Sequence, residues 1–283
     1  AFTYCELEFI SLQTLKNRFM KQLKLMVLTL TLLMGTMFTS CMDSGESGPQ
    51  QWAGVVKVND RMGYVTFTDA AGTELIPTNT IPVTLNARMA YIYCQVDEGQ
   101  DLSTNPKSIK ITLLADPTGI DATAITTPKV GESGDVTTNA PVGSLSFASG
   151  YSTVAPFQFS ENTIVLPVLY RVKNVTTTED IKNELAKHTF TLVCYTDDIK
   201  SGDTILKLYL RYKVEDEPAA IAERATRTSS FKAYEISQIL REYTLKSGQA
   251  KPAKITIVAQ QNEYNNKLED TSTIEKVYEI EYK

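Results

Sequence analysis

The period of the apolar residues is the feature that most constrains how this chain folds. From Trp52 onward, apolar side chains recur at every second position within short segments, and turn residues separate these segments. Residues 204–214 show the pattern most clearly, because Leu206, Leu208 and Leu210 alternate with charged or aromatic residues. A period of two is that of a β-strand with one face in a core and the other in water. The sequence therefore predicts an all-β fold.

The first part of this region predicts a small closed barrel. Five short strands are expected in it, at residues 52–58, 62–68, 74–77, 87–97 and 108–115. No helical pattern in it is longer than a turn, and an open sheet of this size would leave exposed edges. We therefore expect residues 52–128 to form a barrel like the oligonucleotide/oligosaccharide-binding (OB) fold.

A second domain is expected after a long polar stretch. Residues 116–150 are rich in Thr, Gly, Pro, Ser and Ala, and a loop of this length is uncommon inside one compact domain, so the boundary is placed near Lys129. Further strands are predicted at residues 163–173, 188–195, 204–214, 231–237, 254–260 and 275–282. One short helix is predicted at 178–187, because two acidic residues stand in its first turn and Ile181 and Leu185 are four residues apart. Residues 129–283 are therefore expected to form an antiparallel β-sandwich.

The N-terminal part has the pattern of an export signal. Lys21 and Lys24 precede an uncharged apolar run at residues 25–38, which is shorter than the about 20 residues of a membrane-spanning helix. The run ends in Phe38-Thr39-Ser40-Cys41, which resembles the lipobox where a signal peptidase cleaves before a lipid-modified cysteine. Residues 20–40 are thus the predicted signal peptide, and Cys41 is the predicted lipidation site.

Two further segments follow from this interpretation. Residues 1–19 precede the expected start at Met20, so they are interpreted as an upstream extension. Residues 41–51 are polar and rich in Gly and Ser, which predicts a flexible tether from the lipid to the folded part. The protein is expected at the outer membrane or cell surface of a bacterial envelope, held there by the lipid anchor.

The chain is similar to the NigD-like lipoproteins of Bacteroidetes. The residues that carry the resemblance are Trp52, Gly54 and Val56; Gly63, Tyr64, Val65, Phe67, Asp69, Gly72, Leu75 and Pro77; Lys187, His188, Thr189, Phe190, Leu192 and Val193; and Leu206, Leu208, Leu210 and Arg211. The resemblance implies an OB-like N-terminal domain, a β-sandwich C-terminal domain and a place in the cell envelope. It implies no established biochemical activity.

No catalytic grouping is predicted around the histidine or the cysteines. His188 is the only histidine and falls in phase with Phe190 and other apolar residues of a strand, so a hydrogen-bonded sandwich residue is expected rather than a catalyst. Cys94 and Cys194 lie in apolar strands of different predicted domains. Buried thiols are expected there, with a disulfide as the alternative.

No metal or cofactor site is predicted either. Asp197, Asp198 and Asp203 share one loop and could present oxygens to calcium, but their spacing is not that of an EF-hand. Aspartates in turns usually bond to their own backbone. The segment 143–147 resembles a nucleophile elbow only in part, because its last glycine is missing.

Four aromatic residues form a candidate ligand platform: Trp52, Tyr64, Tyr91 and Tyr93. On a barrel such rings can stack on sugars or bases, although packing residues with a wet hydroxyl are the alternative. The net charge of −5 argues against nucleic acid as a partner, because an acidic surface repels phosphate groups. The predicted function is a non-catalytic binding module for a glycan or an envelope protein. The alternative is an envelope glycoside hydrolase with paired carboxylates in one cleft.

Overall fold

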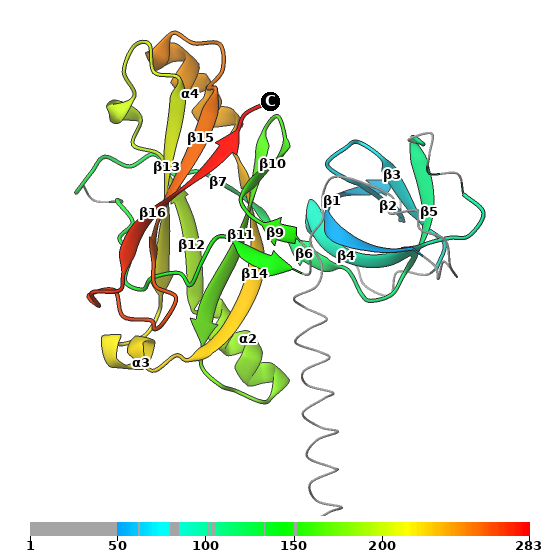
Figure 1. Cartoon of the computed structure of the whole chain (residues 1–283), viewed down its shortest axis with the longest axis horizontal. Helices are drawn as coiled ribbons and strands as arrows, with labels where there is room; N and C mark the ends of the chain where they lie inside the picture. The colour runs from blue at the N-terminus through cyan, green and yellow to red at the C-terminus, as the bar shows by residue number, and fades with distance from the viewer. Residues whose placement is uncertain are drawn as a thin grey trace, which may run out of the picture.

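The structure is a computed structural model that describes residues 50–61, 63–79, 85–100, 102, 106–132, 134–149 and 152–283. The predicted extension, the signal peptide and Cys41 lie outside the described residues. Figure 1 shows two β bodies side by side, a smaller barrel and a larger sandwich. The all-β prediction is confirmed. No helix in the described part of the chain has both the length and the apolar character of a membrane span.

The barrel is closed by five strands. They are β1 (Gln51–Arg61), β2 (Tyr64–Thr68), β3 (Glu74–Pro77), β4 (Met89–Val96) and β5 (Ser108–Leu113). Their order is β1-β2-β3-β5-β4, and pairing of β1 with β4 closes the ring, while β6 (Thr118–Ile120) adds to β4. Only β3 and β5 are parallel. A small five-stranded barrel of this kind confirms the OB-like prediction.

The apolar side chains of the alternating pattern fill the interior of this barrel. Val56, Ala90 and Ile92 are fully buried in its interior with Phe67 and Ile111. The residues between them point outward. Strand β1 is long enough to pair with β4 through its first half and with β2 through its second half. One strand thus links two sides of the ring.

The second body is a sandwich of two four-stranded sheets. The sheet that we call the β11 sheet contains β10 (Phe157–Ser160), β11 (Thr163–Val172), β14 (Thr226–Glu235) and β7 (Ala122–Ala124). The β13 sheet contains β12 (His188–Val193), β13 (Ile205–Val214), β15 (Lys254–Gln261) and β16 (Ile274–Glu281). A hairpin of β8 (Phe147–Ser149) and β9 (Ser152–Val154) lies apart from both.

The core lies between the two sheets. Leu166 and Val168 of β11 belong to the same buried cluster as Leu206, Leu208 and Leu210 of β13. These are the alternating positions that the sequence assigned to the inner faces. The prediction of the strands and their inward faces is confirmed for this sheet pair.

Two strand pairs differ from the antiparallel arrangement that was expected. Strands β13 and β15 are parallel, and so are β14 and β7. After β13 the chain forms the short helix α3 (Pro218–Ala222), crosses to the β11 sheet as β14, and returns through α4 (Ser237–Ser247) to β15. Parallel neighbours need a long crossover of this kind. Alternation alone does not reveal it, because both strand directions share a period of two.

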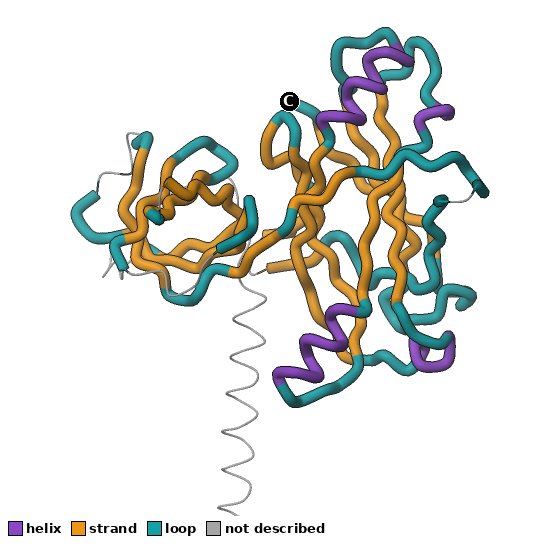
Figure 2. Tube along the Cα trace, turned by 180° about the vertical axis from the view of Figure 1, so that it is seen from behind, coloured by secondary structure: helices purple, strands orange, loops and turns teal. Residues whose placement is uncertain are grey.

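The helices lie at the two ends of the sandwich (Figure 2). The predicted helix is present as α2 (Thr178–Ala186), with the Thr177 hydroxyl accepting the Asp180 N–H. Its apolar residues Ile181 and Leu185 are exposed, and its buried side chain is Glu184. The spacing of the apolar pair therefore indicated a helix correctly but did not indicate which side is buried.

The two bodies touch through an apolar contact. The barrel contributes Val55, Met89 and Ile120, and the sandwich contributes Phe159, Val165 and Ala233. The rings of Tyr91 and Phe231 stack across this contact with centroids 5.5 Å apart. The barrel sheet ends at Ile120 and β7 already pairs with β14, so the chain enters the β11 sheet near Asp121. The domain boundary near Lys129 stays a prediction.

Candidate ligand-binding cleft on the β13 sheet

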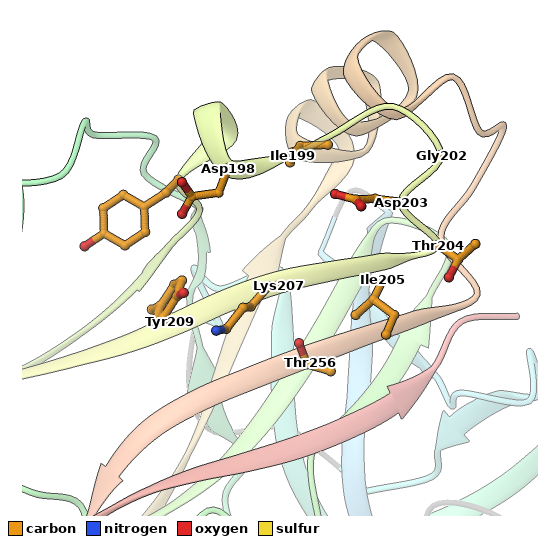
Figure 3. A pocket seen from close by; sticks show the side chains of 10 residues that line it. Asp198, Ile199, Gly202, Asp203, Thr204, Ile205, Lys207, Tyr209 and Thr256 are labelled. Atoms are coloured by element: carbon orange, nitrogen blue, oxygen red, sulfur yellow. The ribbon is translucent and has the colours of Figure 1, made fainter.

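A cleft of about 510 Å³ opens on the outer face of the β13 sheet. Its floor is made by outward-pointing side chains of β13 and β15, namely Ile205, Lys207, Tyr209 and Thr256. The loop between β12 and β13 overhangs this floor and contributes Tyr195, Asp198, Ile199 and Asp203 (Figure 3). The volume falls within the range of about 300–1,000 Å³ that is usual for small-molecule sites.

Tyr209 is held in a fixed place on the floor. The ammonium of Lys207 lies 5.0 Å and the guanidinium of Arg211 5.1 Å from the centroid of its ring. The ring of Tyr195 meets it edge-on with a centroid distance of 5.2 Å. Residues two apart on a strand share a face, which places these two cations beside the ring. The half-buried ring is therefore preorganised.

A hydrogen-bonded chain fixes the end of the cleft next to Tyr209. The Tyr195 hydroxyl donates to Asp135 Oδ1 at 2.9 Å and accepts from Arg211 Nη2 at 2.8 Å. The backbone N–H of Gly131 donates to the other oxygen of Asp135 at 3.0 Å. The Gly131 N–H, then Tyr195 and Arg211, lower the pKa of Asp135, so that it remains a carboxylate.

The overhanging loop is tied to helix α4. Lys246 Nζ donates to Asp197 Oδ1 at 3.0 Å and to the carbonyl oxygen of Thr196 at 2.9 Å. The N–H of Gly202 donates to the carbonyl of Ser247 at 2.8 Å. Gly202 has φ +89°, a conformation that side-chain residues rarely adopt. These bonds hold the wall of the cleft above its floor.

The cleft contains both charged and uncharged hydrogen-bonding groups. Asp198 and Asp203 supply carboxylates, while Thr204, Tyr209 and Thr256 supply hydroxyls. The pKa of Lys207 is raised first by its interaction with Tyr209, then by the charges of Glu275 and Asp198, so it stays an ammonium. This set of groups suits a ligand that carries many hydroxyls and little charge.

The four aromatics predicted as a platform do not form one surface. The Trp52 ring lies over Gly54, where an added Cβ would be 2.7 Å from ring atom Cζ2, and it packs against the barrel core. Tyr91 is in the contact between the two bodies. Two of the four rings are thus used in packing.

The other two members of the predicted platform lie apart. The Tyr93 hydroxyl donates to Gln51 at the start of β1, whereas Tyr64 pairs with Arg61 at its end. Along a strand this separation is about 30 Å. Tyr64 is 57% exposed. Ligand binding at either residue stays a prediction.

The cleft was not predicted from the sequence. The alternation of residues 204–214 puts Lys207, Tyr209 and Arg211 on the face opposite the leucines, and the aspartates of the preceding loop were considered only as calcium ligands. The pattern does not show that residues 195–204 fold back over this face, because that depends on bonds to α4.

The histidine and cysteine predictions agree with the structure. His188 is buried, with Nδ1 2.6 Å from the Tyr212 hydroxyl and Nε2 3.3 Å from Glu184 Oε1. Cys94 and Cys194 are unpaired and buried in separate cores. Burial raises the pKa of both thiols to about 12, which leaves them protonated and unreactive.

One of the loop aspartates bonds to nearby backbone as turn residues do, and another forms an ion pair with helix α4. Asp203 Oδ2 accepts the N–H of Lys200 at 2.7 Å, and Asp197 pairs with Lys246. Within the described ranges, no three His, Cys, Asp or Glu side chains are grouped to hold a metal ion.

Comparison with known proteins identifies the family. No family model and no curated protein matches the sequence. Among solved structures, a protein from Bacteroides fragilis named as a lipoprotein is 96% identical, with a TM-score of 0.77. The similarity covers 83% of this chain and 99% of that chain. The chain belongs to this family of Bacteroides lipoproteins. The sequence-based recognition of a lipoprotein of Bacteroidetes is thereby confirmed, and the NigD-like type stays a prediction.

Two more solved structures are similar at low sequence identity. A protein of unknown function from Bacteroides vulgatus is 11% identical over 83% of this chain and 92% of its own, with a TM-score of 0.52. At this identity the likeness concerns the fold alone. A NigD-like immunity protein from Bacteroides caccae is 10% identical over 85% of this chain and 100% of its own, with a TM-score of 0.47.

Proposed function

We propose that this lipoprotein is a non-catalytic binding protein of the bacterial envelope and that the cleft on the β13 sheet binds an uncharged oligosaccharide. In this proposal the lipid on Cys41 holds the protein at the outer membrane or cell surface. The tether of residues 41–51 lets the two β bodies reach the ligand. The single observation that carries the proposal is the mixture of fixed groups around Tyr209.

The chemistry of this mixture matches a sugar. Each sugar hydroxyl can donate to a carboxylate such as Asp198 and accept from an ammonium such as Lys207. The Tyr209 side chain offers apolar surface for the C–H groups of a pyranose and a hydroxyl beside it. A few well-placed polar groups in a cleft are what orient a small ligand.

The charges favour an uncharged ligand over a polyanion. One cation and two carboxylates line the cleft. A polyanion would approach Asp198 and Asp203, and this encounter costs Coulomb energy.

The positions of the carboxylates favour binding over hydrolysis. Asp198 and Asp203 hang from the same loop, and the floor opposite them carries no carboxylate (Figure 3). A glycosidase places two carboxyl groups on either side of the bond that it breaks. The lining of this cleft does not provide that pair.

A glycan array followed by titration calorimetry tests the proposal. The mature chain is screened against uncharged bacterial, plant and host oligosaccharides, and the best ligand is then titrated into variants. Lys207→Gln and Tyr209→Ala are each expected to weaken binding by about tenfold or more.

The matched controls are Lys213→Gln and Tyr264→Ala. Lys213 is exposed on the same strand, and Tyr264 is an exposed tyrosine of another loop. Both should bind like wild type. A folded protein that binds no glycan on the array, or one whose affinity is unchanged in Lys207→Gln, would refute the assignment of the cleft.

A further inference from the structure

Two arginines face each other on the β11 sheet. Arg171 of β11 and Arg227 of β14 are direct partners in the antiparallel ladder. They alternate with the inward-facing Tyr170 and Thr228, so they share the outer face of the sheet. Like charges at directly opposite positions repel each other and destabilise a strand pair. Their presence therefore needs a compensating interaction.

The two guanidinium groups converge on one carbonyl oxygen. Arg171 Nη2 and Arg227 Nη2 each lie 2.6 Å from the carbonyl oxygen of Glu263, and both donate to it. Arg171 Nη1 donates to the carbonyl of Ala225 at 3.1 Å. The Nε of Arg171 is buried and has no hydrogen-bond partner. The cluster thus has a buried donor that the protein itself leaves unsatisfied.

Carboxylates do not neutralise this pair. Neither arginine forms a salt bridge with any carboxylate in the described ranges. The nearby Glu263 carboxylate accepts a hydrogen bond from Gln261 instead. Arg171 is only 7% exposed, and burial, followed by the charge of Arg227, lowers its pKa. A buried cation without a counter-charge is costly, because carbonyl dipoles replace only part of its hydration.

We infer that the Arg171–Arg227 pair is a binding site for a tetrahedral oxyanion, either phosphate or sulfate. Guanidinium groups bind such anions through paired N–H donors, and two of them on one face can hold one anion together. Arg227 is exposed and gives access from solvent, whereas Arg171 supplies the buried charge.

The anion has two chemical sources. It is either the free ion or an ester group on a larger envelope molecule. The site belongs to the β11 sheet and shares no residue with the cleft on the β13 sheet. A test of the anion site is therefore independent of a test of the proposed function.

Calorimetry on the mature chain tests the site with three probes. Sodium phosphate, sodium sulfate and glucose 6-phosphate are titrated against a chloride background of equal ionic strength. Saturable binding is expected for the wild-type protein. The Arg227→Gln variant removes an exposed side chain and is expected to keep the fold, and it should bind about tenfold more weakly or not at all.

Arg241→Gln is the matched control. Arg241 is an exposed arginine on α4, so its loss changes the net charge equally without touching the site. Thermal unfolding gives a second readout. Sulfate stabilises proteins generally, but the extra stabilisation over chloride should be smaller in Arg227→Gln than in Arg241→Gln.

The outcomes separate the possibilities. Tighter binding of glucose 6-phosphate than of phosphate assigns the site to an ester-borne group, and the reverse order assigns it to the free ion. If none of the three probes binds the wild type saturably, or if Arg227→Gln binds as well as Arg241→Gln, the inference is wrong.

Discussion

Glu184 shows how a single residue can determine the burial of a whole helix. Its carboxylate accepts from Arg224 Nε at 2.7 Å, from the Lys173 N–H at 2.9 Å, and lies 3.3 Å from His188 Nε2. Arg224 also pairs with Asp216 at 3.1 Å. Because Arg224 is almost fully buried, losing Glu184 would leave its charge in the core with Asp216 as its remaining carboxylate partner. These contacts outweigh the exposure of two apolar residues on the same helix.

His188 predicts a pH dependence of stability. Burial lowers the pKa of His188 and outweighs the opposing effect of Glu184, so the folded protein holds it neutral. The unfolded chain protonates it below about pH 6.5 and then binds more protons than the folded state. Stability should therefore fall between pH 6.5 and 5, with a slope of up to about 1.4 kcal/mol per pH unit.

Urea unfolding measured from pH 8 to 5 checks this prediction. The protein has one histidine, so this window reports on His188 before the carboxylates titrate. The His188→Gln variant should lose most of the slope. Parallel curves for variant and wild type would contradict the explanation.

At the scale of elements, the sequence predicted what depends on local periodicity. Strand β13 and its inward leucines follow from alternation, and α2 follows from its first-turn acids and the spacing of Ile181 and Leu185. Which side of α2 is buried depends on the bond between Glu184 and Arg224, which are forty residues apart. A local sequence pattern does not reveal a pairing over this distance. The parallel pair β13–β15 and the overhang of residues 195–204 were missed for the same reason. The four aromatics were grouped because they fall on predicted strands, and strand position alone does not place rings together.

The start of α2 gives a prediction about capping. The Thr177 hydroxyl accepts the N–H of Asp180 at 3.1 Å and donates to its carboxylate at 2.6 Å. Thr177→Ala should lower the free energy of unfolding by about 1 kcal/mol, and Thr177→Ser should restore most of it. The control is Thr178→Ala, the next residue, which has no such role. Equal losses in urea unfolding for both alanine variants would argue against the cap.

At the scale of the whole molecule, the division into a barrel and a sandwich was predictable, but their contact was not. The sequence pattern predicts that Tyr91 is an aromatic residue on the surface of a strand. The structure shows that its ring stacks on Phe231. The contact is carried by a few apolar residues from each body. Interfaces between domains of this modest kind permit relative motion when they are weakened.

Removing the Phe231 ring should loosen the two bodies without unfolding either. Phe231→Ala deletes the stack, which is worth about 1 kcal/mol beyond the buried area. Small-angle X-ray scattering should show a larger radius of gyration, and a protease should cut faster near Asp121. Tyr64→Ala, which removes an exposed ring elsewhere on the barrel, is the control. An unchanged radius and cutting rate in Phe231→Ala would mean that the stack does not hold the bodies together.

The sandwich is closed by contacts between segments that lie far apart in the sequence. Thr123 contacts Ala233 across 110 positions, and Ser144 contacts Tyr278 across 134. Strand β16, which carries Tyr278, follows the other strands of both sheets in the sequence. Contacts between such distant segments form slowly, and they cannot begin before both segments have been synthesised. The sandwich of this lipoprotein therefore cannot be completed until β16 has left the ribosome.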